Sequence, residues 1–159
     1  MIYTLKDIWD SLPAEKKLQD GLWTRFVLRP LSIPVTWGAL VLGMSANGVS
    51  YLSLIFSLVG GVLFSLEGFR FPLWGAILLN IFSIMDCVDG NISRVTKTAG
   101  PWGGWADAVM GFIAYTAVFL STGVYVYLRT GWWLALVLTA LTSSANLLTR
   151  LAYQIYKNI

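Results

Sequence analysis

Three aspartates stand where apolar segments of this sequence give way to polar ones, and their spacing allows them to act together. Asp86 and Asp89 are three residues apart, so on a helix they share one face. Asp107 follows a short polar stretch and lies just inside the next apolar segment. If that stretch brings the two segment ends together, the three carboxylates converge near the membrane surface. The alternative is that each carboxylate merely ends a helix at the interface, with Asp89-Gly90 as a turn.

The chemistry of such a cluster follows from its charge. Converging carboxylates repel one another in a medium of low dielectric constant, so they need a cation or some must be protonated. Oxygen ligands favour Mg²⁺, Mn²⁺ or Ca²⁺ over zinc or copper, and Mg²⁺ is usually held by a few carboxylates together with substrate phosphates. The absence of histidine excludes a histidine general base and the usual histidine ligands of zinc. The cluster therefore predicts a divalent-metal site for a phosphate-bearing substrate.

The composition places these aspartates in a membrane protein. Of the 159 residues, 57% are hydrophobic and only 12% are charged, whereas a soluble domain carries about 25% charged residues. The net charge of +3 suits contact with the headgroups of membrane lipid and does not indicate nucleic acid. A single cysteine, Cys87, allows no internal disulfide. We therefore expect an all-α integral membrane protein of one domain's length.

The apolar segments predict about four transmembrane helices, each close to the length that crosses a bilayer. They cover residues 49–66, 71–88, 105–128 and 132–151. We read residues 89–102 as a polar loop and residues 47–159 as a transmembrane helical bundle.

Residues 1–46 are expected to form cytosolic or interfacial N-terminal helices. Leu5, Ile8, Trp9 and Leu12 recur at helical spacing. This amphipathic face suits either a helix on the membrane surface or a short helix packed on its own protein. A break is expected at residues 45–48, before the first span, and the alternative is a longer first span fused with the preceding apolar segment.

The distribution of lysine and arginine predicts the orientation. With the N-terminus in the cytoplasm, nine of the 11 basic residues are inside and only Arg70 and Arg129 are outside. The inside set is Lys6, Lys16, Lys17, Arg25, Arg29, Arg94, Lys97, Arg150 and Lys157. We therefore expect a multi-pass protein whose N-terminus and aspartate site are cytoplasmic.

The aspartates belong to a longer pattern that resembles a known family signature. The chain reads Asp86-Cys87-Val88-Asp89-Gly90-Asn91-Ile92-Ser93-Arg94, and after eight further residues come Gly103 and then Asp107. This is similar to the signature of the CDP-alcohol phosphatidyltransferases, D-x2-D-G-x2-A-R-x8-G-x3-D-x3-D. Upstream, the segment 45–50, with Asn47, resembles the P-N-x-x-T opening of the family's first span.

The resemblance implies a function and a set of site residues. The family transfers a substituted phosphate from a CDP-linked donor to an alcohol acceptor in phospholipid biosynthesis and releases CMP. The implied partners are a CDP-linked lipid or headgroup substrate and membrane lipid, and the implied cofactor is Mg²⁺ or Mn²⁺. By position, the metal ligands would be Asp86, Asp89 and Asp107. The residues implied for the substrate and nucleotide are Gly90, Ser93, Arg94, Gly103 and Asn47.

Two departures from the family pattern affect these expectations. Gly111 occupies the position of the fourth aspartate, the family's proposed general base, so no catalytic base is assigned. A general base typically contributes about 10²–10⁴-fold, so we expect strongly reduced activity or none by the usual route. The family commonly has six spans where this sequence predicts four, so a homodimer or a partner chain is expected to close the groove.

These departures keep other functions open. One is a catalytically inactive family member that serves as a nucleotide-binding or lipid-binding partner subunit. Another is a small membrane scaffold whose acidic cluster is an ion site.

Overall fold

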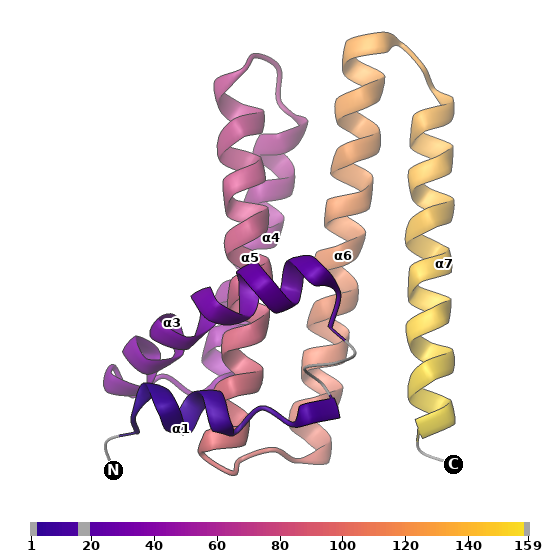
Figure 1. Cartoon of the computed structure of the whole chain (residues 1–159). Coiled ribbons are helices and arrows are strands. Elements are labelled where there is room, and N and C mark those ends of the chain that lie inside the picture. Colours follow the sequence, from indigo (N-terminus) through magenta and orange to yellow (C-terminus); the bar gives the residue numbers. More distant parts are fainter. Residues whose placement is uncertain (1–2, 16–19, 158–159) are drawn as a thin grey trace. The chain divides into compact units, whose positions relative to one another are not determined.

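A computed structural model of the chain describes residues 3–15 and 20–157. Among these residues the regular structure is helical and no β-strand occurs, which confirms the all-α prediction. The helices, in chain order, are α1 (Leu5–Asp10), the π-helical turn η1 (Thr24–Leu28), α3 (Arg29–Val41), α4 (Ala46–Ser65), α5 (Arg70–Val95), α6 (Pro101–Thr130) and α7 (Leu134–Lys157), as Figure 1 shows. Lys16 and Lys17, two of the basic residues assigned to the cytoplasm, lie outside the described ranges.

Four helices are long and apolar enough to cross a membrane, as predicted. The segments are Ala46–Ser65, Arg70–Val95, Gly103–Thr130 and Leu134–Ala152. In the most apolar 18-residue stretch of each segment, the protein buries only 33%, 33%, 28% and 11% of the residues, in the same order. Most of these side chains therefore face outward although they are apolar, an arrangement that suits lipid better than water.

The chain divides into two compact units that share three of the long helices. The first unit contains the chain up to Ile55 together with Asn80–Met110, and the second contains Phe56–Leu79 together with the chain from Gly111 onward. Helices α4, α5 and α6 each contribute a segment to both units. The division predicted at residue 46 coincides with the start of α4 and remains a prediction as a domain boundary.

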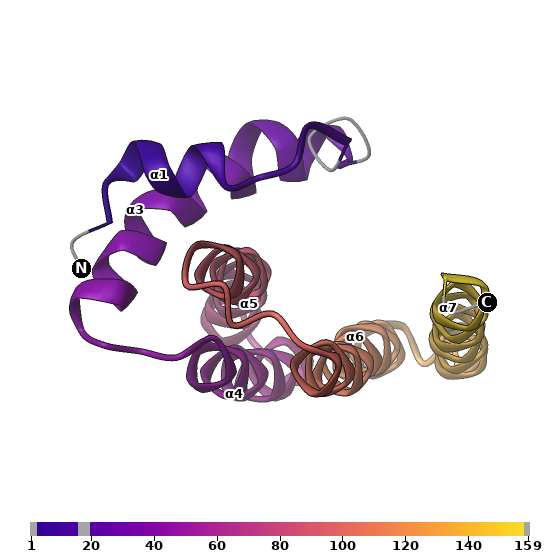
Figure 2. The same ribbon diagram turned by 90° about the horizontal axis from the view of Figure 1, so that it is seen from below.

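In the first unit, α1 packs on its own protein. A capping box between Thr4 and Asp7 starts the helix, and the hydrogen bonds from Thr4 lower the pKa of the Asp7 carboxyl. Helix α1 runs alongside α3 in both views (Figures 1 and 2). Ile8 and Leu12 of the predicted apolar stripe are buried, whereas its other two members are exposed. Packing within the protein thus explains why two of the four residues of that stripe are apolar.

The break before the first span lies a few residues earlier than predicted, between the end of α3 at Val41 and the start of α4 at Ala46. Gly43 adopts a positive φ of 70°, which favours glycine because it has no Cβ, and the helix ends there. The backbone N–H of Gly48 then donates to Ser45 Oγ at 3.1 Å. Ser45 therefore caps the N-terminus of α4.

Helix α5 extends further than we predicted. The polar loop expected at residues 89–102 is wrong for its first half, because α5 continues as far as Val95. The hydroxyls of Ser93 and Thr96 donate to the carbonyls of Gly90 and Ile92 at 3.1 and 2.7 Å, so these polar side chains are satisfied within the helix. As a consequence the whole stretch 86–94 lies on one helix.

In the second unit, small polar side chains connect the helices. Ser57 Oγ of α4 donates to the carbonyl of Ala114 in α6 at 3.1 Å. Ser143 Oγ of α7 donates to Thr116 Oγ1 of α6 at 3.1 Å. Such contacts are typical of helices that pack in lipid, where the hydrophobic effect does not drive association.

Candidate functional site

The first unit contains a cavity of about 440 Å³. Its walls come from the start of α4, the last turns of α5, the connection at residues 96–100 and the start of α6. The lining residues are Met44, Ser45, Ala46, Asn47, Ser50, Asp89, Gly90, Ile92, Ser93, Thr96, Thr98, Ala99, Gly100, Gly103, Gly104 and Asp107. A cavity of this size is within the usual range for a small-molecule site.

Asp89 is the buried carboxylate of this cavity. It is only 6% exposed, and its Oδ2 accepts a hydrogen bond of 2.6 Å from Ser50 Oγ of α4. Because a buried carboxylate without partners is costly, the Ser50 hydroxyl stabilises Asp89 in its place.

The other two aspartates differ in position. Asp107 of α6 is exposed and lines the same cavity as Asp89, whereas Asp86 is half-buried and does not line it. Both charges act on Asp89 by Coulomb repulsion, so the three side chains are within electrostatic range. Within residues 3–15 and 20–157, however, no group of three His, Cys, Asp or Glu side chains is arranged to hold a metal ion. The structure thus brings two of the three predicted ligands to one cavity.

Those two carboxylates still fit the predicted cofactor. Around Asp89 and Asp107 the cavity offers oxygen atoms that can act as metal ligands, among them the Ser50 hydroxyl oxygen. Mg²⁺ is commonly held by one or two carboxylates and completed by water and substrate phosphates. The donor set therefore suits Mg²⁺ or Mn²⁺, and the role of Asp86 as a third ligand stays a prediction.

Most of the predicted nucleotide-binding residues also line this cavity. Asn47, Gly90, Ser93 and Gly103 come from three helices and all contribute to its wall. Gly90 and Ser93 lie there together with Asp89 because α5 continues through them, which places all three residues within one turn of the same helix face. Whether they contact a nucleotide stays a prediction.

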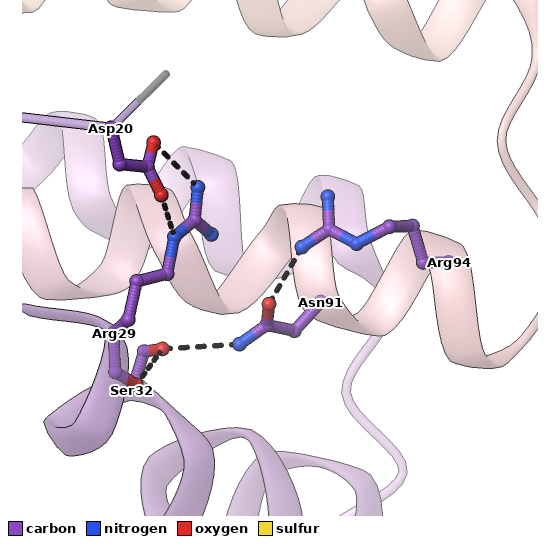
Figure 3. A network of polar contacts seen from close by, with 5 residues as sticks. All are labelled: Asp20, Arg29, Ser32, Asn91 and Arg94. Carbon is purple, nitrogen blue, oxygen red and sulfur yellow. Dashed lines mark hydrogen bonds and ion pairs between the residues drawn. The ribbon is translucent and has the colours of Figure 1, made fainter. Parts of the chain in front are cut away.

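Arg94 is placed differently, because it does not line this cavity. Its Nη2 donates to Asn91 Oδ1 at 2.6 Å, as Figure 3 shows. The guanidinium lies against the backbone of Gly90, where an added Cβ would be 3.2 Å from Nη1. Arg94 therefore stands behind one wall of the cavity.

A buried arginine, Arg29, lies beside this network. Arg29 of α3 is 7% exposed, and its Nε forms an ion pair with Asp20 at 2.8 Å (Figure 3). Burial is the largest effect and disfavours the charged guanidinium, but the hydrogen bond that Arg29 donates to Asp20 and the nearby negative charges together outweigh it, so the pKa of Arg29 is raised. Arg29 therefore remains charged.

The comparison with known proteins decides the family. The profile of the CDP-alcohol phosphatidyltransferases matches residues 43–158. The chain belongs to the CDP-alcohol phosphatidyltransferase family. The apolar spans are accordingly those of a multi-pass membrane protein.

One relative among the CDP-alcohol phosphatidyltransferases is the phosphatidylinositol phosphate synthase of Streptomyces avermitilis. The two sequences are 31% identical over 77 residues, which is 48% of this chain and 31% of the relative. The match thus spans about a third of the relative's length.

The family's fourth aspartate is absent here, and an arginine lies close to its position. A Cβ added to Gly111 would lie 3.7 Å from Nη1 of Arg150 in α7. Arg150 is held by Asn146, whose Oδ1 accepts from Nε at 3.1 Å, and by Tyr115, whose ring centroid is 4.1 Å from the guanidinium carbon. Position 111 therefore lacks the family's carboxylate and lies next to the guanidinium of Arg150, which other side chains hold in place.

Sequence reasoning did not nominate two groups of residues at this site. Ser50 occupies the threonine position of the family's P-N-x-x-T opening, so the resemblance already contained its signal. Ser32 and Thr36 of α3 contact Asn91, and no motif marked Thr36. Their contribution depends on packing between distant segments.

Proposed function

We propose that this chain transfers a substituted phosphate from a CDP-linked donor to an alcohol acceptor in phospholipid biosynthesis, with release of CMP. The observation that carries the proposal is that Asp89 and Asp107, which are 18 residues apart, line one cavity with Gly90, Ser93 and Gly103 of the same signature. The similarity to a phosphatidylinositol phosphate synthase makes phosphatidylinositol phosphate the first product to test.

The residues have distinct roles in this reaction. The acceptor oxygen forms a new bond to the donor phosphorus, and the bond to the bridging oxygen breaks, so that CMP leaves with that oxygen. Asp89 and Asp107, with Asp86, would hold Mg²⁺ or Mn²⁺, which when bound neutralises the diphosphate and stabilises the leaving CMP. Ser50 holds the Asp89 carboxylate in place. Positioning and electrostatics supply most of the acceleration.

The acceptor proton is the weak point of this mechanism. Gly111 offers no carboxylate to receive it, so it must pass to water or to another group at the site. The same observation favours a second candidate function, in which the chain binds CDP-linked ligands as an inactive partner subunit. The cytoplasmic orientation and a homodimer or partner chain belong to both proposals.

A titration distinguishes the candidates. The purified chain is titrated with CDP-diacylglycerol with and without Mg²⁺ or Mn²⁺, and CMP release is followed with inositol phosphate as acceptor. Metal-dependent binding with release supports transfer, and binding without release supports the partner subunit. If no metal-dependent binding occurs, both proposals are wrong.

Matched variants test whether the metal-dependent binding takes place in the cavity. We expect Asp89→Asn and Asp107→Asn each to weaken metal-dependent binding at least about 10-fold, because each removes a charge from the metal site. Asp10→Asn makes the same chemical change at an exposed position in α1 and should have no effect. An equal loss in all three variants would contradict the assignment.

A further inference from the structure

Asn91 connects the N-terminal helices to the end of α5. Its side chain is buried, with the residue only 3% exposed, and its Nδ2 donates to Ser32 Oγ at 3.1 Å and to Thr36 Oγ1 at 3.0 Å. Ser32 and Thr36 are fully buried in α3. Figure 3 shows Asn91 between Ser32 on one side and Arg94 on the other.

The two hydroxyls determine which way the amide of Asn91 points. Ser32 Oγ donates its proton to the carbonyl of Arg29 at 2.8 Å, and Thr36 Oγ1 donates to the carbonyl of Ser32 at 2.7 Å. Each hydroxyl has one proton, so toward Asn91 both can only accept. Both protons of Nδ2 are therefore used by α3, and Oδ1 is left facing Arg94.

Oδ1 in turn determines the position of the Arg94 guanidinium. The bond from Arg94 Nη2 to Asn91 Oδ1 is 2.6 Å, and Nη1 lies over Gly90 in the cavity wall. Among the described residues, the buried Nε of Arg94 has no hydrogen-bond partner. The bond to Asn91 is therefore the main directional restraint on a charged group next to the cavity.

We propose that Asn91 is a positioning residue of the donor site, through which Ser32 and Thr36 of α3 hold the Arg94 guanidinium against the cavity wall. The proposal rests on the proposed function, because the ligand that gains from a fixed cation is the diphosphate of a CDP-linked donor. Pure packing does not explain the arrangement, since a buried amide is costly unless every polar atom is paired. Helix α3 thus becomes part of the donor site without lining its cavity.

The test removes the two acceptors on α3 and measures binding of CDP in the presence of Mg²⁺. In the full chain with Ser32→Ala and Thr36→Val, we expect the Kd for CDP to rise about tenfold, the size expected for a lost charge-assisted hydrogen bond. Thr36→Ser keeps the hydroxyl and should stay within about twofold of the original chain. Ser53→Ala is the matched control, because Ser53 is a buried serine whose hydroxyl donates to the backbone carbonyl of Ser50 within its own helix.

A double-mutant cycle shows whether the effect acts through Arg94. In an Arg94→Ala background the double substitution on α3 should cause no further loss of CDP affinity, because the group that it positions is gone. The proposal would be overturned if the double substitution lowered CDP affinity as much in the Arg94→Ala background as in the original chain. An unchanged Kd in the first experiment would also overturn it.

A second measurement separates this proposal from the proposed function. Hydrogen exchange at the amides of residues 90–95 should become faster when Ser32 and Thr36 are replaced and should stay unchanged in Ser53→Ala. If the original chain fails to bind CDP, the proposed function is wrong. Hydrogen exchange alone then tests whether Ser32 and Thr36 hold the end of α5 through Asn91. Unchanged exchange in the double variant would overturn it.

Discussion

Asp89 and Asp107 show how two carboxylates from the same signature come to have different surroundings. Asp89 is enclosed and receives a 2.6 Å hydrogen bond from Ser50, whereas Asp107 of α6 is exposed and lines the same cavity. At the scale of the residue, the site thus combines one enclosed acid with one exposed acid.

Gly111 leads to a prediction at the same scale. In Gly111→Asp the restored carboxylate would lie beside the Arg150 guanidinium and pair with it. An ion pair lowers the pKa of a carboxyl and makes it a poorer base. We therefore expect CMP release to be at least about 10-fold faster in Gly111→Asp combined with Arg150→Gln than in Gly111→Asp alone.

The control for this prediction is Arg150→Gln with Gly111 intact, which should not accelerate CMP release because it supplies no base. Equal rates in the single Gly111→Asp variant and the double variant would show that Arg150 does not suppress the restored carboxylate.

At the scale of the element, α4 and α5 approach each other closely at a pair of glycines. A Cβ added to Gly75 would lie 2.6 Å from the Cα of Phe64 and 2.7 Å from the carbonyl oxygen of Gly60. Backbone atoms cannot move aside as the end of a flexible side chain can. This contact thus requires glycine at position 75 for steric reasons, as small-residue packing between membrane helices does.

Gly75→Ala should therefore destabilise the protein by about 1–3 kcal/mol through overpacking. Gly38→Ala is the matched control in α3, because nothing lies within 4 Å of its added Cβ, and there alanine should stabilise the helix by about 0.5–1 kcal/mol. Thermal unfolding in lipid or detergent measures both changes. A lower melting temperature in both variants, by the same amount, would contradict the steric explanation.

At the scale of the whole molecule, the distribution of charge and the length of α5 predict the membrane orientation. This helix covers 26 residues, so at about 1.5 Å per residue its two ends lie on opposite faces of a bilayer. The connection before it carries Glu67, and the connection after it carries Lys97. The bias of lysine and arginine predicts that Lys97 is cytoplasmic.

Labelling with a membrane-impermeant maleimide tests this orientation. The buried Cys87 is first replaced by alanine, and Lys97→Cys or Glu67→Cys is then introduced at an exposed position. In sealed cells we expect Glu67→Cys to react and Lys97→Cys to react only after the membrane is opened. The reverse pattern would show that the N-terminus and the aspartate site face outward.

Much of this protein can be predicted from sequence because the signals are local. The four spans follow from runs of apolar residues, and the common face of Asp86 and Asp89 follows from the period of a helix. The prediction of a loop at residues 89–95 is wrong, because polar side chains can remain in a helix when they hydrogen-bond to its own carbonyls. The hydroxyls of Ser93 and Thr96 instead bond within the helix.

The sequence by itself determined the helical class, the four spans and the order of the signature residues. The tertiary structure alone decided that Ser50 holds Asp89, that Asp86 stays off the cavity wall and that Asn91 meets Ser32. The physical reason is distance along the chain. The Ser50–Asp89 bond joins residues 39 apart and the Asn91–Ser32 bond joins residues 59 apart, so both depend on how helices pack rather than on the pattern of any one helix.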